Sequence, residues 1–128
     1  DVSISVVVTI PEYPYSHLTG KELEGIPIYG ASDMEHIHLC EVMLDESVPV
    51  QAGDKVAHMP CYVTAGDYVL VVTGTGETIT GARKSAYTAC RKVSIPNSPG
   101  YRLDIGRGKL VENLPRIQRH GYAKGLGY

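Results

Sequence analysis

The chain has 128 residues, a mass of 13.9 kDa and a formal net charge of −2 at pH 7. This length fits one compact domain and leaves little room for a second. Hydrophobic residues make up 43% of the sequence and charged residues 20%, a balance that excludes disordered, fibrous and collagen-like chains. The nine tyrosines are the whole aromatic content, so each buried tyrosine needs a partner for its hydroxyl group.

Targeting and redox signals are weak in this sequence. No apolar run approaches the roughly 20 residues that a membrane helix requires, so we expect no membrane partner. The start at Asp1 shows neither an initiator Met nor a basic leader, and we expect a cytoplasmic piece of a longer chain. Cys40, Cys61 and Cys90 lack the close spacing of zinc and redox motifs. We therefore expect unpaired structural thiols.

Acidic and basic residues are unevenly distributed along the chain. Residues 1–64 carry ten acids and two bases, whereas residues 65–128 carry four acids and ten bases. The second half therefore predicts a basic face that attracts an anion. These bases are not interleaved with stacking aromatic residues, and the acidic half would repel a polyanion. A small phosphate-bearing ligand is favoured over nucleic acid.

The first half of the sequence predicts short strands. Residues 4–10 are rich in β-branched side chains and stop at Pro11, which cannot extend a ladder, so they predict a buried strand. The remaining elements are a surface loop over 11–20, at most an edge strand over 26–30, a half-buried strand over 36–43, and short meander strands over 48–50 and 61–64 around a turn at 52–54.

The second half predicts a central strand followed by a helix. Residues 68–73 form the strand, and after Gly74-Thr75-Gly76 the apolar period changes from two to about 3.6. Thr78 is the expected cap, and the helix is expected to end before Pro96. The predicted buried face of this helix consists of Ile79, Ala82, Ala86, Tyr87, Ala89, Cys90 and Val93.

A short final helix is expected after the basic loop. Pro115 would stand in its first turn, Gly121 beyond its end, and a loose tail would follow from Ala123. The whole pattern predicts an α+β fold with a mainly antiparallel sheet, a meander resembling a barrel or sandwich hybrid, one long amphipathic helix and a short C-terminal helix.

Most local signals for catalysis or metal binding are weak. His36 and His38 would project from one face of a strand, but no third ligand stands at a suggestive spacing, so we assign no metal site. The glycines at 74 and 76 lack both the dinucleotide fingerprint and the P-loop continuation, and favour a tight turn. No serine or cysteine stands in a recognised nucleophile setting, so we assign no catalytic residue.

The basic loop over residues 101–109 is the strongest candidate site. Arg102, Arg107 and Lys109 lie among glycines that let backbone N–H groups approach an anion, and arginine offers a planar fork for its oxygens. Asp104 could orient the guanidinium of Arg102. The alternative is a solvated loop in which Asp104 simply pairs with Arg102 or Arg107.

The order of several motifs resembles a known family. They are Gly20-Lys21-Glu22-Leu23 after the opening strand, the run from Ala65-Gly66-Asp67 to Glu77-Thr78, the pairs Ala82-Arg83 and Ala86-Tyr87, and Tyr101-Arg102-Leu103-Asp104-Ile105-Gly106. Together they resemble the C-terminal domain of phosphoribosylamine–glycine ligases, also called glycinamide ribonucleotide synthetases, over roughly residues 4–107.

This resemblance implies an ATP-grasp ligase that joins phosphoribosylamine to glycine through a glycyl phosphate, with ATP and Mg²⁺, in purine biosynthesis. Residues 1–108 would form the ligase C-terminal domain and residues 109–128 an extension. The domain would pack against the ATP-grasp lobe of the same full-length chain and help to close the active site. That lobe would hold the cofactors, so the fragment alone would bind none and would be inactive.

The resemblance also assigns roles to residues of the basic loop. Arg102 occupies the arginine position of the family's Tyr-Arg-x-Asp-Ile-Gly motif and would bind the substrate phosphate, with Asp104 orienting it. Arg107 and Lys109 would act as secondary cations in phosphate binding.

Two segments depart from the family pattern, His36-Ile37-His38 and Met59-Pro60-Cys61-Tyr62. A divergent paralogue with another amine or acid substrate therefore remains open. The competing function is a small, non-enzymatic β-rich module that binds a phosphorylated metabolite or a partner protein.

Overall fold

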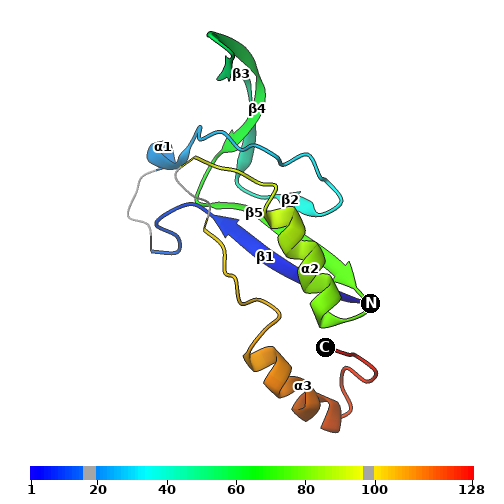
Figure 1. Cartoon of the computed structure of the whole chain (residues 1–128). Helices are drawn as coiled ribbons and strands as arrows, with labels where there is room; N and C mark the ends of the chain where they lie inside the picture. The colour runs from blue at the N-terminus through cyan, green and yellow to red at the C-terminus, as the bar shows by residue number, and fades with distance from the viewer. Residues whose placement is uncertain (16–19, 97–99) are drawn as a thin grey trace.

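A three-stranded antiparallel sheet forms the centre of the molecule. The computed structural model describes residues 1–15, 20–96 and 100–128. Strand β5 (Tyr68–Gly76) lies between β1 (Val2–Thr9) and β2 (Ile37–Leu39), so the strand order is β1-β5-β2 (Figure 1). The strand predicted over 36–43 is wrong in its extent, because β2 ends at Leu39, although the Cys40 and Glu41 amides still donate to carbonyls of β5.

Strand β1 follows the expected period of two. Ile4, Val6 and Val8 are buried, whereas Ser3 and Ser5 are exposed on the opposite face. Val6 stands opposite Val72 of β5. The alternation shows that only one face of the sheet is fully covered, so β1 is buried on one side.

Helix α2 (Ile79–Cys90) covers the buried face of β1 and β5 (Figure 1). The predicted cap is confirmed, because the Thr78 hydroxyl accepts a hydrogen bond from the Gly81 amide at 3.1 Å. The helix ends at Cys90, earlier than predicted. Ser94 instead exchanges backbone hydrogen bonds with Tyr29, so the chain is already extended there.

Two glycines of β5 allow α2 to approach the sheet closely. A Cβ atom added to Gly74 would lie 2.2 Å from the Ala86 amide nitrogen and 2.5 Å from the Ala82 carbonyl oxygen. One added to Gly76 would lie 2.6 Å from the Ala82 nitrogen. These glycines are therefore required for helix packing, and both belong to β5 rather than to a turn that follows it.

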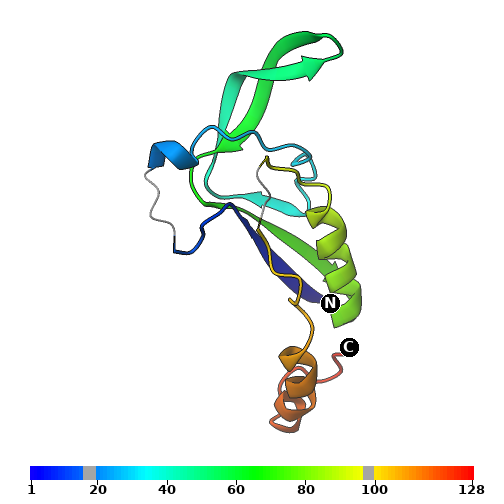
Figure 2. The same cartoon turned by 60° about the vertical axis from the view of Figure 1, so that its left-hand side comes forward.

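Strands β3 (Val42–Ala52) and β4 (Lys55–Thr64) form a separate hairpin that extends away from the sheet (Figures 1 and 2). The expected turn at residues 52–54 is confirmed, but the short meander strands are in fact two long ones. At the base of the hairpin, the buried Thr64 hydroxyl donates to the Leu23 carbonyl at 2.6 Å. Leu23 ends the short helix α1 (Gly20–Leu23).

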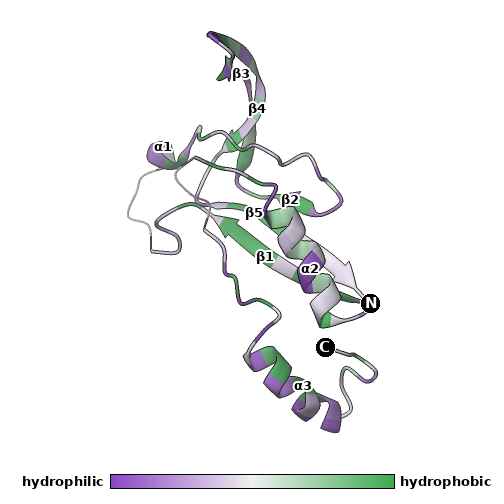
Figure 3. Cartoon of the chain, in the orientation of Figure 1, coloured by the Kyte–Doolittle hydropathy of each residue, from purple (hydrophilic) through white to green (hydrophobic). Residues whose placement is uncertain are grey.

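Helix α3 (Lys109–Arg119) begins after Gly108, which has a φ of +58°. The Glu112 amide donates to the Gly108 carbonyl, so the helix starts well before Pro115 and the placement of this proline in the first turn is wrong. Leu114 is the buried residue of this helix. Hydrophilic and hydrophobic residues alternate along the helix (Figure 3).

The tail after α3 returns to the start of α2 (Figure 1). The Ile79 amide donates to the Gly127 carbonyl, and the Gln118 side-chain amide donates to the Leu126 carbonyl at 2.8 Å. Leu126 also packs against the core. The tail that the glycines predicted to be loose thus makes defined contacts with α2 and α3.

The predicted α+β class with a mainly antiparallel sheet is confirmed, and the described strands form two separate sheets rather than a closed barrel. Among the residues described, no helix is both long and apolar enough to cross a membrane.

Candidate functional site

Tyr87 of α2 fixes the path of the basic loop. Its ring is buried, and its hydroxyl donates to the Arg102 carbonyl at 2.5 Å and accepts from the Ile105 amide at 3.3 Å. The partner expected for a buried tyrosine is therefore the loop backbone. Burial raises the pKa of Tyr87, so the hydroxyl remains a hydrogen-bond donor at neutral pH.

Arg102 and Asp104 form a bidentate ion pair at the loop surface. Arg102 Nε lies 2.9 Å from Asp104 Oδ1, and Arg102 Nη2 lies 2.6 Å from Asp104 Oδ2. Their side chains are 74% and 63% exposed, so the pair faces solvent. Hydrogen bonding to Arg102 lowers the pKa of Asp104, and the same contact raises the pKa of Arg102. The carboxylate can hold the guanidinium plane while the other N–H groups stay available to an anion.

The three predicted phosphate-binding cations do not line one cavity. Arg102 lines a cavity of about 420 Å³ together with Thr9, Tyr13 and Tyr101. Arg107 instead lines a cavity beside α2, and Lys109 is the exposed first residue of α3.

The turn at Gly106 explains why Arg102 and Arg107 line different cavities. Its φ is +77°, and an added Cβ atom would lie 2.6 Å from Ile4 Cδ1. The chain turns here against β1, and Arg107 follows immediately.

The cavity beside α2 has a volume of about 430 Å³ and a mainly cationic lining. Arg83, Lys84 and Arg91 of α2 contribute to it together with Arg107 and the ring of Tyr87. We did not predict this grouping from the sequence. The spacing of Arg83, Tyr87 and Arg91 was the available signal, because residues four apart share one side of a helix.

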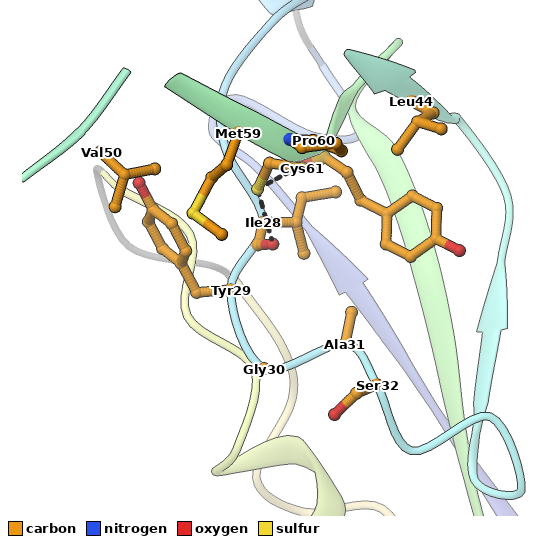
Figure 4. A pocket seen from close by; sticks show the side chains of 11 residues that line it. Ile28, Tyr29, Gly30, Ala31, Ser32, Leu44, Val50, Met59, Pro60 and Cys61 are labelled. Atoms are coloured by element: carbon orange, nitrogen blue, oxygen red, sulfur yellow. Dashed lines mark hydrogen bonds between the residues drawn. The ribbon is translucent and has the colours of Figure 1, made fainter. Parts of the chain in front are cut away.

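An apolar cavity of about 450 Å³ lies between the chain after Ile28 and the β3–β4 hairpin (Figure 4). Tyr29 faces Val50 and Met59 across it, and the Cys61 thiol donates to the Ile28 carbonyl at 3.6 Å. The lining is mostly hydrocarbon, so this cavity suits an apolar contact rather than an anion.

His36 lies in a polar cluster outside the basic loop. Its Nδ1 is 3.0 Å from Asp33 Oδ1, and its Nε2 is 3.4 Å from Ser85 Oγ. The hydrogen bond to His36 lowers the pKa of Asp33. Ser85 stands inside α2, and Lys92 Nζ also lies 3.5 Å from Asp33 Oδ2. We assign this cluster no catalytic role.

The two histidines expected on one strand face have different partners. His38 Nε2 lies 2.8 Å from Thr73 Oγ1, whereas His36 precedes β2 and contacts Asp33 and Ser85. Within the described ranges, no three His, Cys, Asp or Glu residues could share a metal ion. The three cysteines are free thiols, and burial raises the pKa of Cys90 to about 11.

The fold and the site together define a small α+β domain with an exposed basic loop and a second cation-lined cavity. Residues 3–108 match the family model described as phosphoribosylglycinamide synthetase, C domain. The chain therefore belongs to this family, and the resemblance inferred from the order of its motifs is confirmed.

Similar proteins carry the name phosphoribosylamine–glycine ligase. The relative from Salmonella typhimurium is 33% identical over 104 residues, which cover 81% of this chain and 21% of the relative. The relative from Streptomyces coelicolor is 31% identical over 82% of this chain and 22% of its own length. The relative from Archaeoglobus fulgidus is 34% identical over 75% of this chain and 17% of its own length. The chain thus spans about a fifth of the length of the curated relatives it matches.

Proposed function

We propose that this chain acts as the C-terminal domain of a cytoplasmic phosphoribosylamine–glycine ligase. The full-length enzyme would join phosphoribosylamine to glycine in purine biosynthesis, with ATP and Mg²⁺ supplied at an ATP-grasp lobe of the same chain. The observation that carries this proposal is the family match over residues 3–108, which includes Arg102, Asp104 and Arg107 of the basic loop. Residues 109–128 would be an extension to this domain.

Substrate phosphate recognition is the proposed task of the basic loop. A 5′-phosphate is a dianion that must be held at a fixed distance from the reacting amine, and an oriented arginine positions it better than a flexible lysine. The bidentate contact with Asp104 and the exposure of Arg102 support this role. Arg107 and Lys109 would add positive potential without forming the same site.

Magnesium would have to be held elsewhere in the full-length enzyme. In the described part of this chain, no three His, Cys, Asp or Glu side chains cluster together. The 128-residue chain alone is expected to show no ATP hydrolysis, which an assay of phosphate release can check.

The apolar face of the β3–β4 hairpin is the proposed contact with the rest of the ligase. Leu44 is 57% exposed and Met59 is 49% exposed, next to the apolar cavity of Figure 4. Exposed apolar surface of this kind is costly in water and marks an interaction surface. Since the matched region covers only 21% of the Salmonella typhimurium relative, another domain of the same ligase is the occupant that we propose.

The decisive experiment is Arg102→Ala in the full-length ligase. We expect the KM for phosphoribosylamine to rise ten- to hundredfold, because a charge-assisted contact to the phosphate is lost. The constants for ATP and glycine should change far less. Arg119→Ala, which removes the same charge from the exposed end of α3, is the matched control. An unchanged KM for the phosphorylated amine would mean that the loop is structural.

A domain exchange tests the ligase assignment itself. This chain would replace the matching region of the Salmonella typhimurium relative, and ligase activity would be measured in the chimaera. Activity above that of the truncated relative supports the proposal. Binding of a phosphorylated metabolite by the chain without activity in the chimaera would favour the non-enzymatic binding module.

A further inference from the structure

The cation-lined cavity beside α2 is separate from the surface around Arg102. Its walls come from the solvent-facing side of α2, from the chain just after Gly106, and from Tyr128 at the end of the tail. The C-terminal tail lies beside the start of α2 in both views (Figures 1 and 2), and the isolated bridge between Thr78 and Gly127 fixes that approach. Three segments far apart in sequence therefore build this cavity.

Positive charge predominates in this cavity. Arg83, Lys84, Arg91 and Arg107 all line it, and none of them forms an ion pair with a carboxylate in the described part of the chain. Asp104, which stands three residues before Arg107, is paired with Arg102. Like charges that are gathered in this way repel one another, and an anion between them removes that repulsion.

Several of these side chains are already held in place. The Arg83 guanidinium carbon lies 4.4 Å from the centre of the Tyr87 ring, and its Nη2 donates to the Leu103 carbonyl. Arg83 Nε is shielded from solvent and has no hydrogen-bond partner. Arg91 Nη2 lies 3.3 Å from the Thr88 hydroxyl. Binding to such prepositioned groups costs less conformational entropy than binding to free side chains.

The position of Arg107 is also determined by the fold. The Arg107 amide donates to the Asp104 carbonyl at 3.0 Å, directly after the turn at Gly106. The Tyr128 hydroxyl donates to the Gly106 carbonyl at 3.3 Å and closes the same turn from the tail side. Arg107 therefore faces α2 because a positive-φ glycine and the tail together direct the chain there.

We propose that this cavity binds a small molecule bearing one or two phosphate groups, at a site independent of Arg102. Arginine forks match phosphate oxygens in two-point contacts, and three arginines line the cavity. A volume of about 430 Å³ is within the range of small-molecule sites. A nucleic acid would extend beyond the cavity, toward the acidic half of the chain. This site goes beyond the proposed ligase function and does not depend on it.

Binding of inorganic pyrophosphate to the 128-residue chain tests the proposal, measured by isothermal titration calorimetry at low ionic strength. We expect saturable binding with one site per chain. Arg107→Ala and Arg91→Ala should each raise the Kd about tenfold, and the double variant more, because each removes a charge-assisted contact. Both side chains are outside the core, and circular dichroism will check that the fold is kept. Arg91→Lys keeps the charge but not the planar guanidinium, so its Kd should lie between those of the unchanged chain and Arg91→Ala.

Variants that remove one positive charge outside the cavity distinguish binding at this site from general electrostatic attraction of the anion. Arg119→Ala and Arg116→Ala each remove one positive charge from the exposed side of α3, outside the cavity, and should leave the pyrophosphate Kd within about twofold. No binding at millimolar pyrophosphate, or an equal loss in all four single alanine variants, overturns the proposal. Tighter binding of a single-stranded oligonucleotide that weakens equally in every variant also overturns it, in favour of a nucleic-acid surface.

The same variants distinguish this site from the ligase proposal. The two sites are independent, as we propose, if Arg102→Ala changes the KM for phosphoribosylamine but not the pyrophosphate Kd, whereas Arg107→Ala changes the pyrophosphate Kd. If Arg102→Ala also abolishes pyrophosphate binding to the chain, the separate site is refuted and the phosphate role of Arg102 is kept.

Discussion

The β1-β5-β2 sheet and the β3–β4 hairpin are both antiparallel and differ mainly in what covers them. In the sheet, α2 closes over one face, and residues such as Leu70 and Val72 are fully buried. In the hairpin, Val48 and Val63 are buried, while Leu44, Val56 and Met59 remain exposed. Strand pairing alone therefore does not make a core, because a two-stranded ribbon has no second layer to exclude water from its faces.

The hairpin is attached at its base, through contacts that differ from those of the sheet. Thr64 accepts a hydrogen bond from the Ile26 amide at 3.1 Å and donates one to the Leu23 carbonyl, so hydrogen bonds add to the packing of the buried Val63 at this junction. The outer part of the hairpin is free to contact another surface. We therefore expect mutations in the sheet to lower the free energy of unfolding far more than mutations in the outer part of the hairpin.

The largest effect is expected at the contact between β5 and α2. Gly74→Ala places a Cβ atom within 2.2 Å of the Ala86 amide nitrogen, so the helix backbone must move. We expect a loss above about 4 kcal/mol in the free energy of unfolding, or failure to fold. Gly81→Ala is the control, because its Cβ atom would meet nothing closer than the Thr78 hydroxyl at 3.4 Å. A stable Gly74→Ala protein in chemical denaturation would contradict the close packing.

Replacing one leucine by alanine in each region should show directly how much more the sheet contributes to stability than the hairpin. Leu70→Ala in β5 opens a cavity in the core and should cost about 2–5 kcal/mol. Leu44→Ala in β3 removes a side chain that is already 57% exposed and should cost under about 1 kcal/mol. Urea denaturation followed by circular dichroism gives both values. Equal losses would mean that the hairpin contributes to the core after all.

Alkaline pH should weaken the core through Cys90. Burial raises the pKa of this thiol from 9.0 to about 11, so between these values the unfolded chain releases the proton and the folded chain keeps it. The free energy of unfolding should therefore keep its full value below pH 9 and decrease by about 2 to 3 kcal/mol as the pH rises to 11. Cys90→Ala should show less of this decrease in denaturation curves recorded across that range. If the free energy of unfolding falls equally with pH in both proteins, the buried Cys90 thiol is not the cause of the decrease.

The smallest effect on stability is expected at the exposed ion pair of the basic loop. Asp104→Asn removes the carboxylate charge facing Arg102, but both side chains are largely solvated and salt screens them. We expect an unchanged urea midpoint at neutral pH. In the full-length ligase the same substitution should still raise the KM for phosphoribosylamine, because Arg102 loses the group that holds its plane. A clear shift of the midpoint would assign the pair a structural role instead.

The sequence by itself determined the elements whose periodicity reflects burial. The alternation in β1, the helical face of α2, the Thr78 cap and the need of Tyr87 for a hydroxyl partner were all predictable, since each depends on residues close in sequence. The motif order also led to the correct family. The lengths of β3 and β4 were not predictable, because an uncovered hairpin has no strict alternation of apolar and polar residues.

Only the tertiary structure decided how the cations are grouped. Arg102 and Arg107 are five residues apart, yet the turn at Gly106 places them in different cavities. Arg107 instead joins Arg83 and Arg91 of α2, which are distant in sequence. The tail from Ala123 likewise packs on α2 through contacts that local glycine content cannot encode. Local patterns determine strands and helices, whereas a site depends on which distant segments the packing of the core brings together.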